Sequence, residues 1–267
     1  MDYESVIRSF LPSKPLQDFV SHYTLADPCQ NFVRLQPAFP QQYLIFFPHN
    51  AQQFSTDGNS YLPLPNELLV GPFTQPVFLT IDPFQFTIIV TLHPGALHRL
   101  IGMPLHEIMN LPLEGVNGFG NEIRKINEQL ANDKTHGQKI KRIEDFLLKR
   151  IQKAKDTLPI DHTLSLISRD PTGYSIDQLA DLSCVSLRQF ERQFLERIGT
   201  TPTMFMRQSR FKKAFGLKRT KPNLNWTTIA YECGYFDQMH FIRDFKQFTA
   251  TTPTAFKTFL LPARVMA

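Results

Sequence analysis

The C-terminal part of this 267-residue chain contains one pattern twice. The stretch "SIDQLADLSCVSLRQFERQF" begins at Ser175, and "IAYECGYFDQMHFIRDFKQF" begins at Ile229. Leu179 aligns with Ile229 at an offset of 50, whereas Phe190 aligns with Phe241 at an offset of 51. A repeat of this kind predicts one structural unit built twice, with one residue inserted at the second turn.

Each copy has the start and stop signals of two short helices joined by a sharp turn. These cap and turn residues are Ser175, Gln178, Ser186 and Gly199 in the first copy, and Asn225, Gly234 and Asp237 in the second. The spacing predicts a helix-turn-helix in each copy.

The second helix of each copy has an apolar face with two Phe residues four positions apart. The opposite face is predicted to point outward and carries Arg188, Gln189 and Arg192 in the first copy, and Met239, His240 and Arg243 in the second. Arg forks onto guanine and Gln pairs with adenine, so these residues suit a major-groove reader. Solvation alone also explains a charged helix face, but it gives no reason for the Arg to recur at equivalent positions.

Residues 202–220, between the copies, read as a helix because Pro suits its first position. Nineteen residues at ~1.5 Å each span roughly 28 Å, which can set two readers about one duplex turn apart, ~34 Å. The candidate phosphate neighbours on and beside this helix are Arg207, Arg210, Lys212, Lys213, Lys218 and Arg219.

The net charge differs between the two parts of the chain. Residues 1–156 contain 14 Lys and Arg against 15 Asp and Glu, net −1, whereas residues 157–267 contain 15 against 9, net +6. Such asymmetry predicts a polyanionic partner, with nucleic acid first and an acidic membrane surface second. The chain has neither a signal peptide pattern nor a run of 18 apolar residues, so we expect a cytoplasmic protein that does not enter a membrane.

Over roughly residues 157–262 the sequence resembles the AraC/XylS family of bacterial transcription regulators. The resemblance is carried by "LADLSCVSLRQFERQF", "IGTTP", "IAYECGYFDQMHFIRDFKQF" and "TTP". It implies an all-α domain of two helix-turn-helix units joined by a linker helix, double-stranded operator DNA and RNA polymerase as partners, and no cofactor. The base-reading positions that it implies fall on Arg188, Glu191, Arg192, Gln238, Met239, His240 and Arg243.

Two residues depart from the family pattern. Cys184 stands where the second copy has Gly234, so a positive φ at this turn would strain the backbone by ~1 kcal/mol, or else the turn is built differently. Ala250 stands where Gly usually ends the second recognition helix, which weakens the expectation of a C-cap there.

Residues 1–156 are predicted to form an α+β domain that binds an effector or dimerises. Branched and aromatic residues in "QYLIFFPH" and "FQFTIIVTLH" predict strands. Helical patterns follow at 95–101, 104–110, 121–130 and 137–153. The stretches "LLVGPFTQP" and "TLHPGALHRLIGMPLHEIMNLPLEGV" resemble an N-terminal domain of some AraC-like regulators, over roughly residues 8–150.

An enzyme-like N-terminal domain tethered to a DNA-binding module is the alternative function. No catalytic motif supports it, and the three neighbouring histidines His93, His98 and His106 lack a metal-binding spacing. The three cysteines also lack metal-ligand spacing, and their odd number argues against a disulfide framework.

Two further features of this half leave alternatives open. The aromatic residues of its strands belong to the core or line an effector pocket; they are Tyr43, Phe46, Phe47, Phe78, Phe84 and Phe86. A stripe of Ile140, Ile143, Leu147 and Ile151 packs on its own domain or forms the seam of a homodimer.

Overall fold

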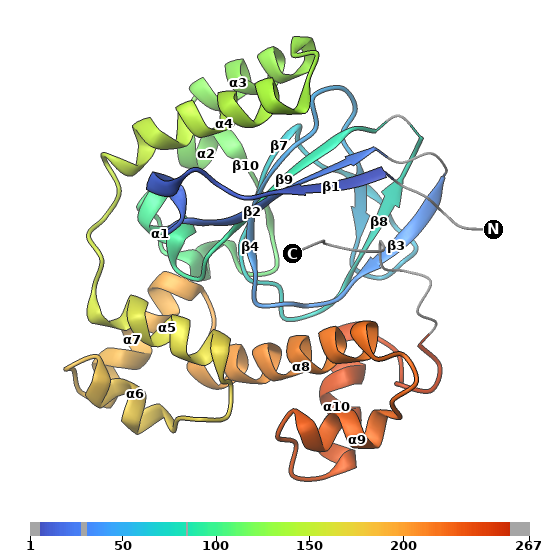
Figure 1. Ribbon diagram of the computed structural model, residues 1–267, viewed down its shortest axis with the longest axis vertical. Coiled ribbons are helices and arrows are strands. Elements are labelled where there is room, and N and C mark those ends of the chain that lie inside the picture. The colour runs from blue at the N-terminus through green and yellow to red at the C-terminus, as the bar shows by residue number, and fades with distance from the viewer. Residues whose placement is uncertain (1–5, 28–30, 84, 257–267) are drawn as a thin grey trace.

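The computed structural model describes residues 6–27, 31–83 and 85–256, which form a β-sandwich with helices on one side and a helical C-terminal domain (Figure 1). One antiparallel sheet has the strand order β1-β2-β9-β4-β7-β10, and the other has the order β3-β8-β5-β6. The strands of the larger sheet are β1 (Val6–Phe10), β2 (Val20–Asp27), β9 (Thr87–Leu92), β4 (Gln42–Phe46), β7 (Glu67–Val70) and β10 (Pro112–Glu114). Those of the smaller sheet are β3 (Phe32–Gln36), β8 (Val77–Ile81), β5 (Gln53–Ser55) and β6 (Leu62–Pro63).

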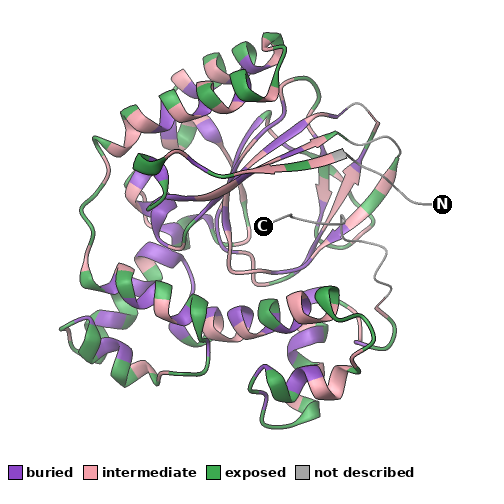
Figure 2. Ribbon diagram, in the orientation of Figure 1, coloured by how far each residue is buried: buried purple, intermediate pink, exposed green. Residues whose placement is uncertain are grey.

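Helices cover the outer face of the larger sheet. They are η1 (Lys14–Leu16), α1 (Ala96–Ile101), η2 (Leu105–Ile108), α2 (Gly115–Phe119), α3 (Glu122–Asn132) and α4 (His136–Ile151). Leu44, Leu69 and Val90 of the sheet and Ile143 of α4 are 0% exposed and lie in one apolar core. Figure 2 shows buried residues concentrated where these helices meet the sheet.

The α+β prediction is confirmed, but most strands are absent from the sequence prediction. The two predicted strands correspond to β4 and β9. The missed strands are short, and β3 alternates apolar residues with Arg34 and Gln36 on its inner face, so it lacks an apolar run. The helical patterns correspond to α1, the 3₁₀ turn η2, α3 and α4, whereas α2 was not predicted.

The apolar stripe of α4 packs on its own domain. Ile143 and Leu147 are at most 1% exposed, and Ile140 and Ile151 pack against the same core. The stripe is therefore not available as a dimer seam, and the second alternative is wrong for these residues. Of the six aromatic residues named as pocket candidates, Phe46 and Phe47 are core, Tyr43, Phe78 and Phe86 are half-buried, and Phe84 lies outside the described residues.

The C-terminal domain contains two helix-turn-helix units joined by one long helix, as predicted. Its helices are α5 (Pro159–Arg169), α6 (Ile176–Leu182), α7 (Leu187–Ile198), α8 (Pro202–Thr220), α9 (Trp226–Glu232) and α10 (Gln238–Thr249). The boundary predicted between residues 156 and 157 lies in the segment that connects α4 to α5. None of the helices in the described ranges is long and apolar enough to cross a membrane.

All four predicted helix starts have the expected caps. The side chains of Ser175, Ser186, Asn225 and Asp237 accept hydrogen bonds from backbone N–H groups in the first turns of α6, α7, α9 and α10. Each cap satisfies a backbone N–H that the helix leaves unpaired, so the start of each of the four helices is fixed at its cap residue.

The turns of the two units are built alike although one has Cys where the other has Gly. Cys184 has φ 56° and Gly234 has φ 77°. Cys184 therefore adopts the left-handed conformation, which strains a residue other than glycine. Ala250 likewise has φ 58°, and its N–H donates to Lys246 O, so α10 has its left-handed C-cap without glycine. A Cβ at residue 234 would lie 2.7 Å from Thr172 Cγ2, so a larger residue there would need this exposed side chain to shift.

We expect Cys184→Gly to raise the free energy of unfolding by about 0.5–1 kcal/mol. Relief of left-handed strain, roughly 1–2 kcal/mol, exceeds the roughly 0.4–1 kcal/mol entropic cost of adding glycine to the unfolded chain. Urea denaturation measures the change. Asp181→Gly, on an exposed face of α6, is the matched control and is expected to destabilise by ~1 kcal/mol. A lower urea midpoint for Cys184→Gly would contradict the strain argument.

Candidate nucleic-acid interface

The first recognition helix, α7, separates an apolar face from a polar one. Phe190 and Phe194 are 0% exposed in the core of the first unit. The four predicted base-reading residues of α7 all lie exposed in its first turn and a half: Arg188, Gln189, Glu191 and Arg192. Residues near the N-terminus of a recognition helix are the ones that reach base edges, so this arrangement suits a major-groove reader.

The second recognition helix, α10, has the same division with one difference. Phe241, Phe245 and Phe248 are at most 1% exposed. The predicted readers Gln238, Met239 and Arg243 are exposed. His240 is partly covered, because its ring meets the Tyr235 ring edge-on at 5.7 Å. His240 therefore presents less of its side chain outward than the sequence predicts.

Arg207, predicted to lie beside phosphate, is instead engaged inside the protein. Its Nε and Nη2 donate to Asp244 Oδ1 at 3.0 and 2.6 Å, and Nη2 also donates to Gln247 Oε1 at 2.6 Å. The Asp244 side chain is 0% exposed, so this pair fixes α10 on α8 from within. A phosphate role for Arg207 stays a prediction, and this geometry gives it a positioning role.

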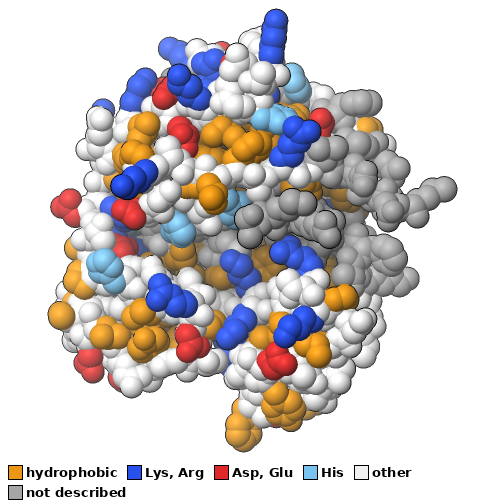
Figure 3. Space-filling model, viewed as in Figure 1, with side chains coloured by type: hydrophobic (Ala, Val, Ile, Leu, Met, Phe, Trp, Pro, Cys, Tyr) orange, Lys and Arg blue, Asp and Glu red, His pale blue; other side chains and the backbone are white. Residues whose placement is uncertain are grey.

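The other basic residues of α8 fall into three groups. Arg210 stacks over the Tyr235 ring at 5.2 Å, and Lys218 donates to Pro222 O and Leu224 O, so both hold the second unit together. Lys213 and Arg219 are exposed and can meet an anion. Lys212 instead lies near His22 and His93 of the N-terminal domain, where burial lowers the pKa of its amine. Figure 3 shows Lys and Arg side chains over the helical domain and along its boundary with the sandwich.

Sequence reasoning missed exposed aromatic residues beside the second recognition helix. Phe236, just before α10, is 90% exposed, Met239 in the first turn of α10 is 68% exposed, and Tyr231 on α9 is 61% exposed. The one-residue difference in offset between the two copies was the available signal for Phe236, because it marks a residue in the second turn that the first lacks.

The N-terminal domain contacts the C-terminal end of α10. The Ala38 N–H donates to Phe248 O at 3.0 Å, and Gln208 Nε2 of α8 donates to Ala38 O and Phe73 O at 2.9 and 2.6 Å. The Phe39 ring packs against Phe211 of α8 at 5.8 Å. The loop between β3 and β4 therefore completes the core of the second unit.

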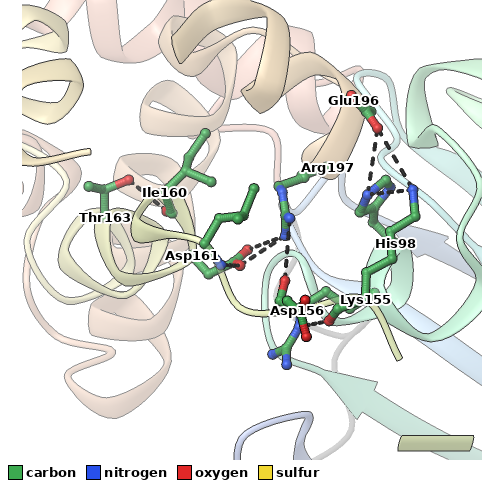
Figure 4. A network of polar contacts seen from close by, with 10 residues as sticks. His98, Lys155, Asp156, Ile160, Asp161, Thr163, Glu196 and Arg197 are labelled. Atoms are coloured by element: carbon green, nitrogen blue, oxygen red, sulfur yellow. Dashed lines mark hydrogen bonds and ion pairs between the residues drawn. The ribbon is translucent and has the colours of Figure 1, made fainter. Parts of the chain in front are cut away.

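The same domain also contacts the C-terminal end of α7. Gly199, which ends α7, packs so closely on η2 that a Cβ there would lie 2.6 Å from Leu105 O. Figure 4 shows the adjoining polar network, in which Glu196 Oε1 lies 3.8 Å from both His98 Nε2 and Lys155 Nζ. Arg197 anchors this end of α7 to the start of α5 through both oxygens of Asp161, at 2.9 and 2.8 Å.

His98 is a structural residue of this contact. It is 1% exposed, and burial lowers the pKa of its imidazole, which favours the neutral form. Its Nδ1–H donates to Met103 O at 2.8 Å, which leaves Nε2 to accept from Lys155. His93 and His106 are exposed, and the described residues contain no group of three or more metal-ligating side chains. Of the cysteines, Cys184 is exposed, Cys233 is buried, and Cys29 lies outside the described residues.

Comparison with known proteins agrees with this geometry. A family model described as a helix-turn-helix domain matches residues 179–258, and a domain of unknown function, DUF6597, matches residues 8–114. The transcriptional activator RhaS of Escherichia coli is 37% identical over 71 residues, which cover 27% of this chain and 25% of RhaS. Residues 179–258 therefore form a helix-turn-helix domain of the AraC type.

Other similarities are more distant. An uncharacterized HTH-type transcriptional regulator of Haemophilus influenzae is 24% identical over 180 residues, 65% of this chain and 59% of that protein. The chain thus matches less than two thirds of the length of either relative. A solved structure of ToxT from Vibrio cholerae is 12% identical in sequence and has a TM-score of 0.47. The match covers 94% of this chain and 97% of the ToxT chain.

We expect Arg243→Ala and Lys213→Ala to weaken DNA binding in different ways. Arg243 lies on the reading face of α10, so its loss should cost ~1–3 kcal/mol and relax specificity at one base pair. Lys213 is exposed on α8, so its loss should weaken all sequences about equally. Competition between matched and mismatched operators separates the two effects. Equal losses on both DNAs for Arg243→Ala would indicate that Arg243 contacts phosphate.

Proposed function

We propose that this chain is a sequence-specific, DNA-binding transcription regulator controlled through its N-terminal domain. The observation that carries the proposal is the pair of recognition helices, both capped at free N-terminal ends and both held at their C-terminal ends. Their reading faces are exposed, and the domain that contains them has the +6 charge that operator DNA attracts. RNA polymerase as the partner of the DNA-bound form belongs to the proposal, as does a homodimer formed through a surface other than the α4 stripe.

We propose that a small molecule controls the chain by binding between the two sheets. The face of the larger sheet that meets the helices is fully buried, whereas Tyr43, Ile45, Val70 and Ile89 on its inner face are only half-buried. Ile45 and Val70 pack against a small apolar cluster there, whereas Tyr43 and Ile89 belong to no apolar cluster among the described residues. These half-buried positions support a ligand site in a partly apolar environment.

Arg34 indicates which class of molecule fits there. It lies on the inner face of β3, donates to Gln36 Oε1 at 2.9 Å, and takes part in no ion pair among the described residues. Its Nε is buried and has no hydrogen-bond partner. Burial lowers the pKa of this guanidinium, so the charged form is poorly compensated.

Tyr43 supplies a second donor on the opposite sheet. Burial raises the pKa of its phenol to about 12, so the hydroxyl keeps its proton and can donate. A guanidinium and a hydroxyl among mixed polar and apolar residues suit a carboxylate attached to a partly apolar body. We therefore propose a small organic anion as the effector. It alters DNA binding only if it favours one arrangement of the two domains.

We expect the full chain to bind duplex DNA with an affinity that falls steeply with salt, because cationic side chains displace condensed counterions. Selection of bound sites from random DNA, followed by titration at several salt concentrations, measures both sequence preference and salt slope. A flat salt response, or no enriched sequence, would refute the DNA-binding function. Turnover of a small molecule by the N-terminal domain would favour the tethered-enzyme alternative instead.

For the effector, we expect organic carboxylates to raise the melting temperature of the full chain while their matched neutral amides do not. Stabilisation should reach ~2.7 kcal/mol at a hundredfold excess over the dissociation constant. Arg34→Met should abolish the response and also raise the melting temperature without ligand, because it removes a buried charge that has no ion pair among the described residues. Arg124→Gln, an exposed arginine, is the control. Equal stabilisation by acids and amides would exclude an anion-specific site.

A further inference from the structure

The residue inserted in the second unit can be identified from the backbone. The Val185 N–H donates to Ala180 O at 3.2 Å, and the Tyr235 N–H donates to Ala230 O at 3.0 Å, so the two turns correspond up to these residues. The next residue in the first unit is the cap Ser186, whereas in the second unit the cap is Asp237. The residue without a counterpart is Phe236.

Phe236 does not make the contact that its position predicts. An apolar residue just before a cap usually packs against the fourth residue of the helix. In the first unit, Val185 fills this place and packs on the core. In the second, Tyr235 is buried and meets Phe241 at 5.2 Å, so Phe236 is displaced outward and is 90% exposed.

The position of Phe236 is nevertheless well defined. The preceding Tyr235 is 2% exposed and is covered by Arg210, while the following Asp237 accepts a hydrogen bond from His240 N at 2.6 Å. Because both neighbouring residues are held in place, the Phe236 side chain cannot turn back onto the protein surface. Exposing a whole phenyl ring also forgoes the burial that an aromatic side chain normally gains.

We propose that Phe236 reads a thymine C5-methyl group in the major groove. This rests on the proposed DNA-binding function. Phe236 immediately precedes α10, and the N-terminal end of a recognition helix is the part that meets base edges. The thymine methyl is the apolar group that the major groove offers, and contact with Phe is a known way to recognise it. Met239, 68% exposed in the same first turn, extends the apolar surface beside the polar readers.

The experiment removes the methyl group without changing base pairing. Once full-chain site selection has given the operator, each thymine is replaced in turn by deoxyuridine, and affinities are measured for the unaltered chain and for Phe236→Ala. We expect one replacement to weaken the unaltered chain about fourfold, as for one buried methyl, and to leave Phe236→Ala unaffected. Phe236→Leu should retain part of the methyl dependence.

Tyr231→Ala, which removes an exposed aromatic ring from α9 of the same unit, is the matched control and should keep the full methyl dependence. Thermal melting checks that each variant folds. The proposal is overturned if the unaltered chain is indifferent to every replacement, or if Phe236→Ala keeps the same dependence. It is also overturned if Phe236→Ala binds every DNA like the unaltered chain but loses transcriptional activity, since Phe236 would then contact a protein. Failure of the unaltered chain to select any sequence would refute the DNA-binding function itself.

Discussion

The burial of aromatic side chains along α8 is the interaction on which the arrangement of the C-terminal domain depends. Phe205 packs edge-on against Phe194 of the first unit at 5.6 Å, and Phe211 packs against Phe245 and Phe248 of the second at 5.5 and 5.3 Å. One rigid helix therefore contributes to two separate cores. Because its apolar residues face one unit at one end and the other unit at the other, α8 has no single apolar stripe along its length.

The N-terminal domain adds a second connection between the same two units. The loop with Ala38 binds the end of α10, while η2 and His98 lie against the end of α7. The relative position of the recognition helices is thus set both by α8 and by a separate folded domain. A change between the sheets of that domain has a direct structural route to α10, since β3 carries Arg34 and leads into the Ala38 loop.

The repeat made much of the C-terminal domain predictable from sequence. Caps and turns depend on local residue chemistry, so Ser186 and Asp237 were recognisable. The alignment of Cys184 with glycine left two conformations open, and the φ of 56° identifies the left-handed one. The engagement of Arg207 with Asp244 was not predictable, because the pair is 37 residues apart and an exposed basic helix has the same sequence pattern. The sandwich was largely missed because its inner faces mix polar and apolar residues. For the same reason, Arg34 gave no signal of its own.

The way in which the recognition helices are held has an evolutionary consequence. Their C-terminal ends and Phe faces carry the packing that stabilises the domain, whereas the reading residues in their first turns are exposed and contribute little to it. Substitutions at exposed positions usually change stability by no more than about 0.5 kcal/mol. Mutations can therefore alter these exposed residues while the fold and the contacts with the N-terminal domain are preserved. Inheritance of a fixed regulatory frame with a variable DNA-reading surface allows related regulators to diverge in target genes.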